Sequence, residues 1–534
     1  MVALRGTTLC HFQTRTARHP AWLTARRTGL NQNWLSRIFA VAATAIVSGC
    51  AVGPDFKTPL APDVSGYTPK PLPAQTVAAA DSTGGPQRFV NGRDLPGDWW
   101  RVFGSPELKN IVERAVQNNP DLAAAQAALR VAQANMVAGA GAFFPSLDGN
   151  FGANRQKTGV ASTSALNQET ATYNLFTSQV QVSYTPDVFG GTRRSVESLQ
   201  AQRDNQRFQL EATYLTLTSN VVVEAIQEAS LRGQIAATYK LIKIETDLLH
   251  VLRDQLSAGV ISEVEISTQE ATLAQTEQAL PPLEQQLAQQ RHLLSALTGG
   301  LPSQEPPEKF ELAALHLPHE LPVSLPSQLV EQRPDVRAAE ENMHSASALI
   351  GVAVANRLPN ISLTASYGVN ALSVEQLFAP GSSTWGLGAT ALMPLLHGGT
   401  LLEKEQAARE TYEQASSQYR SAVITAFRNV ADSLTALQND AAALQKAVGF
   451  EKAAGKTLNI TRRRLQIGEV NYLELLNAQQ TYQRALITLV VAQSNRLADS
   501  AALFQALGGG WWNRDDVDHK KPTSYFVLFN GPIY

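Results

Sequence analysis

Two short motifs hold the residues of this 534-residue chain that could most readily do chemistry. The first, LHLPHE at Leu315–Glu320, offers two histidines and an acid, but it lies among prolines and lacks the spacing of a zinc site. The second, His397–Gly399, is similar to an oxyanion loop. Phe189–Gly191 occupies the matching position of an internal repeat, so turn geometry explains both better. With no phosphate loop, serine elbow or zinc signature either, we expect neither an enzyme nor a bound metal or cofactor.

The cysteine at position 50 indicates a different chemistry. Cys50 follows Val47–Gly49 and the apolar run Ile38–Val47, which has the character of a signal-peptide core. This arrangement resembles a bacterial lipobox, in which signal removal leaves the cysteine as an acylated first residue. We therefore expect a covalent lipid on Cys50, with an ordinary signal peptide and an incidental cysteine as the alternative. Ala51, where an aspartate would favour the inner membrane, favours the outer membrane.

Composition and charge fit long packed helices better than a nucleic-acid surface. Charged residues make up 17% of the chain and the formal net charge is -2, so we expect no nucleic-acid partner. Removing residues 1–49 leaves 38 basic and 46 acidic residues, which makes the mature chain mildly acidic. The length of residues 1–30 leaves the true translation start open. No run of 18 or more apolar residues occurs, so no mature helix is expected to span a bilayer.

The chain contains an internal duplication, which must be recognised before its elements are assigned. Landmarks recur in the same order at offsets of 208 to 214 residues: Pro120-Asp121 with Pro334-Asp335, Pro145 with Pro359, Gly190-Gly191 with Gly398-Gly399, and Gly259 with Gly468.

Proline-rich stretches divide the chain around these two copies. The expected parts are a lipoprotein signal peptide (1–49), a lipidated extended segment (50–97), a first repeat (98–300), a linker (301–326), a second repeat (327–512) and a C-terminal tail (513–534).

Each repeat is expected to hold a pair of β-strands. Apolar residues alternate with polar or small ones over 361–368 and 179–184, loops are expected near 156–174 and 370–384, and 385–393 forms the fourth strand. The strand lengths suit a tilted membrane crossing, although soluble sandwiches alternate in the same way. Four strands cannot close a barrel, and an open edge in lipid leaves backbone groups unpaired. Strands that span a membrane must therefore be pooled between protomers.

A helix of about 65 residues is expected after each glycine pair. Apolar residues from Leu210 to Leu256 and from Tyr412 to Val448 recur at steps of three and four, as in coiled coils. At about 1.5 Å per residue such a helix reaches about 100 Å, a length that suits crossing the periplasm. Gly259 and Gly468 are expected to end these helices, and second helical runs are expected over 262–298 and 471–507. The two turns must lie opposite the strands.

Several motifs resemble the TolC-like outer-membrane factors, specifically the lipoprotein branch often labelled NodT, across nearly all of residues 50–512. The resemblance implies an α+β membrane protein that forms a homotrimer. Twelve pooled strands, four per protomer, would form one β-barrel that continues into a long α-helical periplasmic barrel. The implied function is the passive exit channel of a tripartite efflux system, anchored in outer-membrane lipids and served by a periplasmic adaptor and an inner-membrane pump. The motifs are CAVGPDF, ERAVQNNPDLAAAQAAL, YTPDVFGGTRR, EQRPDVRAAEENM, ANRLPNISLTASYG, RRLQIGEVNYLELLNAQQTY and ALGGGWW.

The resemblance also implies a gate at the periplasmic tip, made of acidic and polar side chains just beyond the two turns. The matching positions are Glu265 after Gly259, and Glu474 and Asn477 after Gly468. Glu474 and Asn477 are three residues apart and so share a helix face. Three copies of a carboxylate at a constriction would attract cations and repel one another. Asn477 stands where the family commonly has an acid, and a solvated helix face is the alternative interpretation of each position.

Two other functions stay open at this point. One is a non-channel structural lipoprotein, either a coiled-coil spacer or an adaptor, although adaptors usually have one helical hairpin rather than two. The other is an exit duct for secreted proteins, because nothing in these residues separates protein cargo from small molecules. The sequence also leaves open the substrate and the class of pump.

Overall fold

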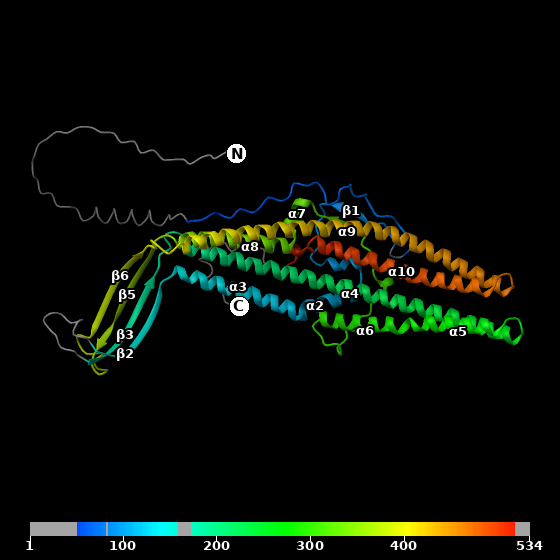
Figure 1. The fold of residues 1–534 in the computed structure, drawn as a ribbon, viewed down its shortest axis with the longest axis horizontal. Helices are drawn as coiled ribbons and strands as arrows, with labels where there is room; N and C mark the ends of the chain where they lie inside the picture. The colour runs from blue at the N-terminus through cyan, green and yellow to red at the C-terminus, as the bar shows by residue number, and fades with distance from the viewer. Residues whose placement is uncertain (1–50, 82–83, 158–171, 518–534) are drawn as a thin grey trace, which may run out of the picture. The chain divides into compact units, whose positions relative to one another are not determined.

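The computed structural model describes residues 51–81, 84–157 and 172–517. Its two longest helices are α4 (Gly191–Ser257) and α9 (Thr400–Gln466), each of 67 residues, as the sequence predicts. Figure 1 shows a four-stranded sheet at one end of these helices and the two turns at the other.

Shorter helices precede and follow the long ones in each repeat. Proline stands near the start of α2, α3, α7 and α8, where its missing N–H costs no helical hydrogen bond. The remaining helices are η1 (Trp99–Phe103), α2 (Pro106–Asn118), α3 (Pro120–Ala140), η2 (Gly141–Phe143), α5 (Glu263–Gln278), α6 (Leu280–Leu297), η4 (Leu312–Ala314), α7 (Pro326–Gln332), α8 (Pro334–Ala355), α10 (Tyr472–Ala506) and η5 (Trp511–Asn513).

The helical run expected over 262–298 is two helices, and this part of the prediction is wrong. α5 ends at Gln278 and α6 begins at Leu280, and Ala279 between them keeps right-handed helical angles, with φ of -74° and ψ of -17°. Pro281 and Pro282 lack the N–H groups that would bond back to the preceding turn, so the helix restarts there. The matching run in the second repeat has no proline at this position and is a single helix, α10.

The core lies where α4, α8, α9 and α10 pack side by side, with aromatic residues from η1 beneath them. The predicted α9 stripe is buried from Tyr419 to Leu444. Trp99 is 1% exposed and stacks on Phe504 with ring centroids 5.5 Å apart. Apolar burial along the helices therefore stabilises the elements that carry the sheet at one end and the turns at the other.

Strands β2 (Ser146–Lys157), β3 (Thr172–Tyr184), β5 (Asn360–Ala371) and β6 (Ser383–Leu392) form one antiparallel sheet in the order β2-β3-β5-β6. The strands are 10 to 13 residues long, and each of the four extends by two or three residues into a loop that the sequence predicts. The outer strands β2 and β6 each have an edge without a partner strand among the described residues. The predicted incomplete sheet is confirmed.

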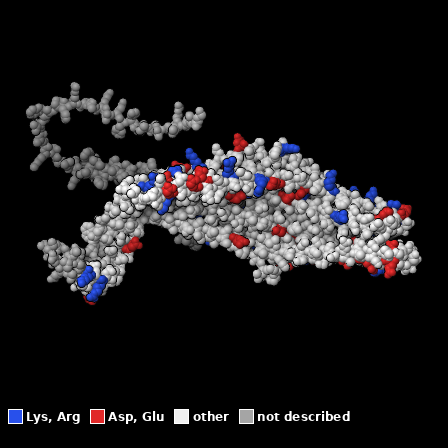
Figure 2. All heavy atoms as spheres, in the orientation of Figure 1, with Lys and Arg blue, Asp and Glu red and all other residues white. Residues whose placement is uncertain are grey.

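Cross-strand register gives this sheet one apolar face and one polar face. Leu147, Val182, Ala365 and Leu387 align in one row, and the next row on the other face contains Asp148, Gln181, Ser366 and Gly386. Charged residues occur only in β2 among the four strands. Figure 2 shows the same contrast, with charge at the far end of the sheet and along the helices, and little on the strands between.

A second, small sheet joins two segments that the sequence suggests are extended chain. Strand β1 (Arg88–Asn91), from the N-terminal segment, pairs in parallel with β4 (Glu320–Val323), from the linker between the repeats. The N-terminal segment is also held against α10 by Arg496, whose Nη2 donates to the Gly85 carbonyl at 2.6 Å. Within the described residues, no helix combines the length and the apolar character that a bilayer crossing requires.

Candidate functional site

The two turns at the helix ends are built identically. Gly259 and Gly468 have φ of 71° and 73°, the left-handed region that glycine enters without strain. In each, the glycine N–H and the next N–H donate to carbonyls of the last helical turn: Gly259 to Leu256 and Val260 to Gln255, then Gly468 to Leu465 and Glu469 to Arg464. This double bond pattern is a Schellman motif, and it confirms the predicted helix ends.

Both predicted gate carboxylates occupy the same position of the helix after the turn. Ser262 caps α5 and Asn471 caps α10, which makes Glu265 and Glu474 the third helical residues. Glu265 completes a capping box: its Oε2 accepts from the Ser262 N–H at 3.1 Å and from the Ser262 hydroxyl. That hydroxyl and the backbone N–H groups hold the pKa of Glu265 below its usual value. Glu265 thus has a structural role within the protomer.

Glu474 and Asn477 lie together in a shallow groove of about 450 Å³ between α9 and α10. Both are exposed, and the groove also contains Thr457, Thr461 and Thr481. The shared face predicted for the pair is confirmed. Glu265 lies on the other hairpin and does not line this groove. The gate role of the three residues stays a prediction.

The basic run before the second turn makes a local contact. Arg464 Nε lies 3.2 Å from Glu469 Oε2, across the turn at Gly468, with both side chains about half exposed. This ion pair stabilises the turn weakly, because solvent screens it.

Buried polar contacts between the two hairpins were not predicted from the sequence. Gln269 of α5 bonds to Tyr472 of α10 and to the backbone of Glu245 in α4. The sequence did contain a signal for such contacts: the carboxyl of Glu245 and the amides of Gln269 and Gln479 stand at core positions of otherwise apolar stripes. Such polar side chains are rarely buried without a hydrogen-bond partner.

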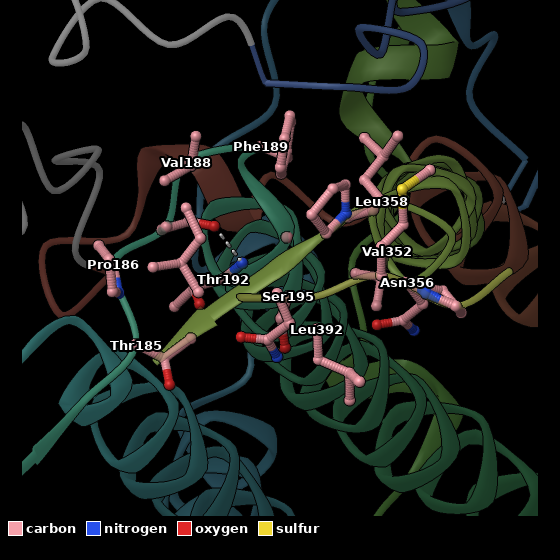
Figure 3. Close-up of a pocket in the computed structure, with 18 of the residues that line it drawn as sticks. Thr185, Pro186, Val188, Phe189, Thr192, Ser195, Val352, Asn356, Leu358 and Leu392 are labelled. Carbon is pink, nitrogen blue, oxygen red and sulfur yellow. Dashed lines mark hydrogen bonds between the residues drawn. The ribbon is translucent and has the colours of Figure 1, made fainter. Parts of the chain in front are cut away.

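A pocket of about 590 Å³ lies where the strands meet the helices (Figure 3). Val188, Phe189, Val352 and Leu392 line it, together with Thr192. Asp187, in the same wall, accepts from the Thr192 N–H at 3.0 Å and the Arg193 N–H at 2.9 Å, so its carboxylate caps the start of α4. His397 also lines the pocket.

The segment after Cys50 is fixed to this junction by charge. Arg194 Nη2 donates to Asp55 Oδ1 at 2.6 Å, and its Nε donates to the Val52 carbonyl at 3.2 Å. Phe56 stacks on His344, with ring centroids 4.4 Å apart. Cys50 itself lies outside the described residues, so its lipidation stays a prediction.

The acid of the linker motif that the sequence singles out, Glu320, forms ion pairs with Arg88 and Arg93.

His344 lies between the carboxylates of Glu197 and Glu341, 3.1 and 3.2 Å from its ring nitrogens. Burial alone would lower its pKa, but hydrogen bonds to these carboxylates outweigh burial and raise the pKa to about 9. The imidazole is therefore charged at neutral pH and helps to hold the N-terminal segment.

Comparison with known proteins identifies the family. A family profile described as outer membrane efflux protein matches residues 111–300 and 325–509, one range in each copy of the repeat. The chain belongs to the outer membrane efflux protein family. The predicted resemblance, the efflux-channel function and the outer-membrane location are confirmed.

Individual family members match over most of their length. The pyoverdine export outer membrane protein OpmQ of Pseudomonas aeruginosa is 29% identical over 458 residues, covering 84% of this chain and 94% of the relative. The toluene efflux pump outer membrane protein TtgC of Pseudomonas putida is 26% identical over 482 residues, covering 89% and 96%. Nodulation protein T of Rhizobium leguminosarum is 24% identical over 475 residues, covering 87% and 96%.

Solved structures of outer-membrane channels share the fold. The channel OprN matches with a TM-score of 0.77 at 23% identity, covering 86% of this chain and all of that one. The Campylobacter jejuni channel CmeC matches with a TM-score of 0.76 at 21% identity, covering 88% and 96%. The predicted α+β fold, with four strands per protomer of a trimeric barrel, is confirmed.

Proposed function

We propose that this efflux protein is the exit duct of a tripartite system that conducts small organic molecules passively and does no catalysis of its own. A periplasmic adaptor would dock at the two turns, and an inner-membrane pump would supply the energy. The observation that carries the proposal is the sheet with one apolar and one polar face at the end of two helices of 67 residues, with no further strand on β2 or β6 among the described residues. Such a sheet suits lipid on one side and a water-filled duct on the other.

The cargo class follows from the polar face and from the relatives. That face presents neutral hydroxyl and amide groups, with Asp148 as its single charged residue: Asn150, Gln179, Gln181, Ser362, Thr364, Ser366, Thr384 and Thr390 are representative. Neutral groups admit many small solutes and discriminate little between them, so substrate choice would belong to the pump. The relatives are named for the export of pyoverdine, toluene and antibiotics, all small organic molecules.

A lipid on Cys50 would anchor the duct from the side. The segment from Val52 to Phe56 is bonded to α4 and α8 next to the sheet, so a lipid one or two residues before it would enter the membrane beside the barrel. Several acyl chains on one residue anchor a protein far more firmly than one.

Metabolic labelling with palmitate tests this lipid. We expect Cys50→Ser to lose the label and Cys10→Ser, in the leader, to keep it. Equal label in both variants would contradict lipidation at Cys50.

In-cell photo-crosslinking tests the docking site. A photoreactive residue at Val260 or Leu473, which are 69% and 61% exposed near the two turns, should capture a periplasmic adaptor. The same residue at Val131 of α3, 60% exposed and distant in sequence from both turns, is the matched control. Capture of a secreted protein alone, or of no periplasmic protein at the turns, would overturn the adaptor-linked function.

A further inference from the structure

One buried side chain joins three helices near the turns. Gln269 of α5 is fully buried, and its Oε1 accepts a hydrogen bond from the Tyr472 hydroxyl at the start of α10. Its Nε2 donates to the Glu245 carbonyl of α4 at 3.1 Å. Because α4 and α5 form the first hairpin and α10 belongs to the second, this side chain ties the two hairpins together.

The carboxyl group of Glu245 lies in the same place and is 2% exposed. Its Oε1 accepts from the Thr276 hydroxyl at 3.1 Å, and its Oε2 has no hydrogen-bond partner among the described residues. A buried carboxylate with one oxygen that lacks a hydrogen bond costs far more free energy than the same group in its neutral, protonated form. Burial, helped by the charge of Glu277, accordingly raises the pKa of Glu245 to about 7 against the lowering effect of Thr276.

An apolar cluster from all four helices keeps water from this carboxyl. Its buried members are Leu241, Leu248, Leu249 and Leu252 of α4, Ile266 of α5, Ala454 and Leu458 of α9, and Leu475, Ala478, Tyr482 and Ala485 of α10.

Each of the four helices brings a charged or titratable group near the cluster. α5 contributes Glu277, and α10 contributes Tyr472, whose pKa burial and the charge of Glu245 raise to about 12. α4 contributes Lys240, whose Nζ donates to the Tyr482 hydroxyl of α10 at 3.1 Å. α9 faces the cluster with Ala454 and Leu458, and its Glu451 carboxylate lies by Gly455, beside the Tyr482 ring.

A second buried polar group without a partner lies in the same cluster. Gln479, 2% exposed, leaves both of its amide atoms unbonded among the described residues. It is seven residues beyond Tyr472, which contacts Gln269, and Thr276 is seven residues beyond Gln269. Residues seven apart share a helix face, so Gln479 lies two turns beyond Tyr472 on the same face of α10, as Thr276 does beyond Gln269 on α5.

We propose that Tyr472, Gln269 and Glu245 form a proton-sensitive latch that holds the second hairpin against the first and so keeps the channel tip closed. The inference rests on the proposed gate at the turns. Moving the second hairpin away breaks the Tyr472–Gln269 bond and lets water reach Glu245. The solvent-exposed carboxyl of Glu245 then ionises, and it must bind a proton before it can return to the apolar cluster. Proton binding therefore favours the closed tip.

The direction and size of the pH effect on opening follow from proton linkage. The closed form binds the proton with a pKa of about 7 and the open form with an ordinary value near 4.5. The open-to-closed ratio should therefore rise with pH between these values, by at most about tenfold per pH unit, and level off above pH 7.

Bilayer recordings of the trimer from pH 5 to 8 test the latch. Wild type should open more often as the pH rises to 7, and Glu245→Gln, which mimics the protonated carboxyl, should lose this rise. Tyr472→Phe should open more often at every pH but keep the rise. Glu270→Gln, an exposed neighbour on α5 paired with Arg253, should match wild type.

Hydrogen exchange of the amides of α5 gives a readout that needs no current. Their protection should fall between pH 5 and 7 in wild type and stay constant in Glu245→Gln. A conducting wild type with no pH dependence, or a Glu245→Gln variant with the wild-type dependence, would overturn the latch alone. A folded trimer that conducts no ions at any pH would overturn the proposed channel function instead, and the exchange data would still decide the latch.

Discussion

Two carboxylates, Glu265 and Glu474, stand just beyond the turns, and the family resemblance implies a gate role for both. Glu265 and Glu474 hold equivalent positions, yet Glu265 is bound to Ser262 whereas Glu474 faces an open groove beside Asn477. A carboxylate at a helix start is stabilised by the helix dipole.

We predict that Glu474→Gln will lower the cation preference of the channel, because it removes one negative charge from the groove of each of the three protomers. Glu265→Gln should leave the melting temperature close to that of wild type, since Gln also completes a capping box. Ion selectivity in bilayers and thermal unfolding measure the two effects. If the double variant keeps both conductance and cation preference, these residues do not form the gate.

His344 should make the attachment of the N-terminal segment depend on pH. Its folded-state pKa of about 9 exceeds the ordinary 6.5, so its contribution is complete below pH 6.5 and lost as the pH rises through 9. The contribution is at most about 3 kcal/mol, and partial exposure reduces it. The melting temperature of wild type should exceed that of His344→Gln at pH 6 and converge with it by pH 10. A gap of the same size at both pH values would contradict a charged imidazole.

At the scale of elements, successive residues of one strand face opposite sides of the sheet, one side toward lipid and the other toward water. Ala365 and Ser366 of β5 point to the apolar and polar faces. An arginine facing lipid costs about 2 to 4 kcal/mol near the bilayer centre, whereas one facing water costs little. We predict that Ala365→Arg will reduce the amount of assembled trimer in the outer membrane, and that Ser366→Arg will assemble but conduct differently. The opposite order of assembly would mean that the faces are assigned wrongly.

The turns offer a second matched pair. Alanine at Gly468 must adopt φ of 73°, at a cost of about 1 to 2 kcal/mol, whereas alanine at Gly449 inside α9 should stabilise that helix by up to about 1 kcal/mol. Neither glycine has a neighbour within 4 Å of an added Cβ. We expect Gly468→Ala to melt earlier than wild type, with faster hydrogen exchange at the turn, and Gly449→Ala to melt no earlier. Equal melting of all three proteins would argue against a required left-handed residue at the turn.

For the whole molecule, the repeat made much of the fold predictable. Periods of two and of three to four residues are local signals, so the strands, the long helices and their glycine ends follow from the sequence. The β1–β4 sheet does not, because four-residue strands more than 200 residues apart leave no periodic pattern. Nor does the bond from Tyr472 to Gln269, since only three-dimensional packing brings positions 203 residues apart together.

Single-channel recording from the purified trimer in a planar bilayer tests the central claim most directly. The account predicts discrete, mostly closed steps in wild type, and longer openings when the hairpins are loosened by Tyr472→Phe. A folded trimer that inserts into the bilayer but passes no current, with or without that substitution, would contradict a gated exit channel.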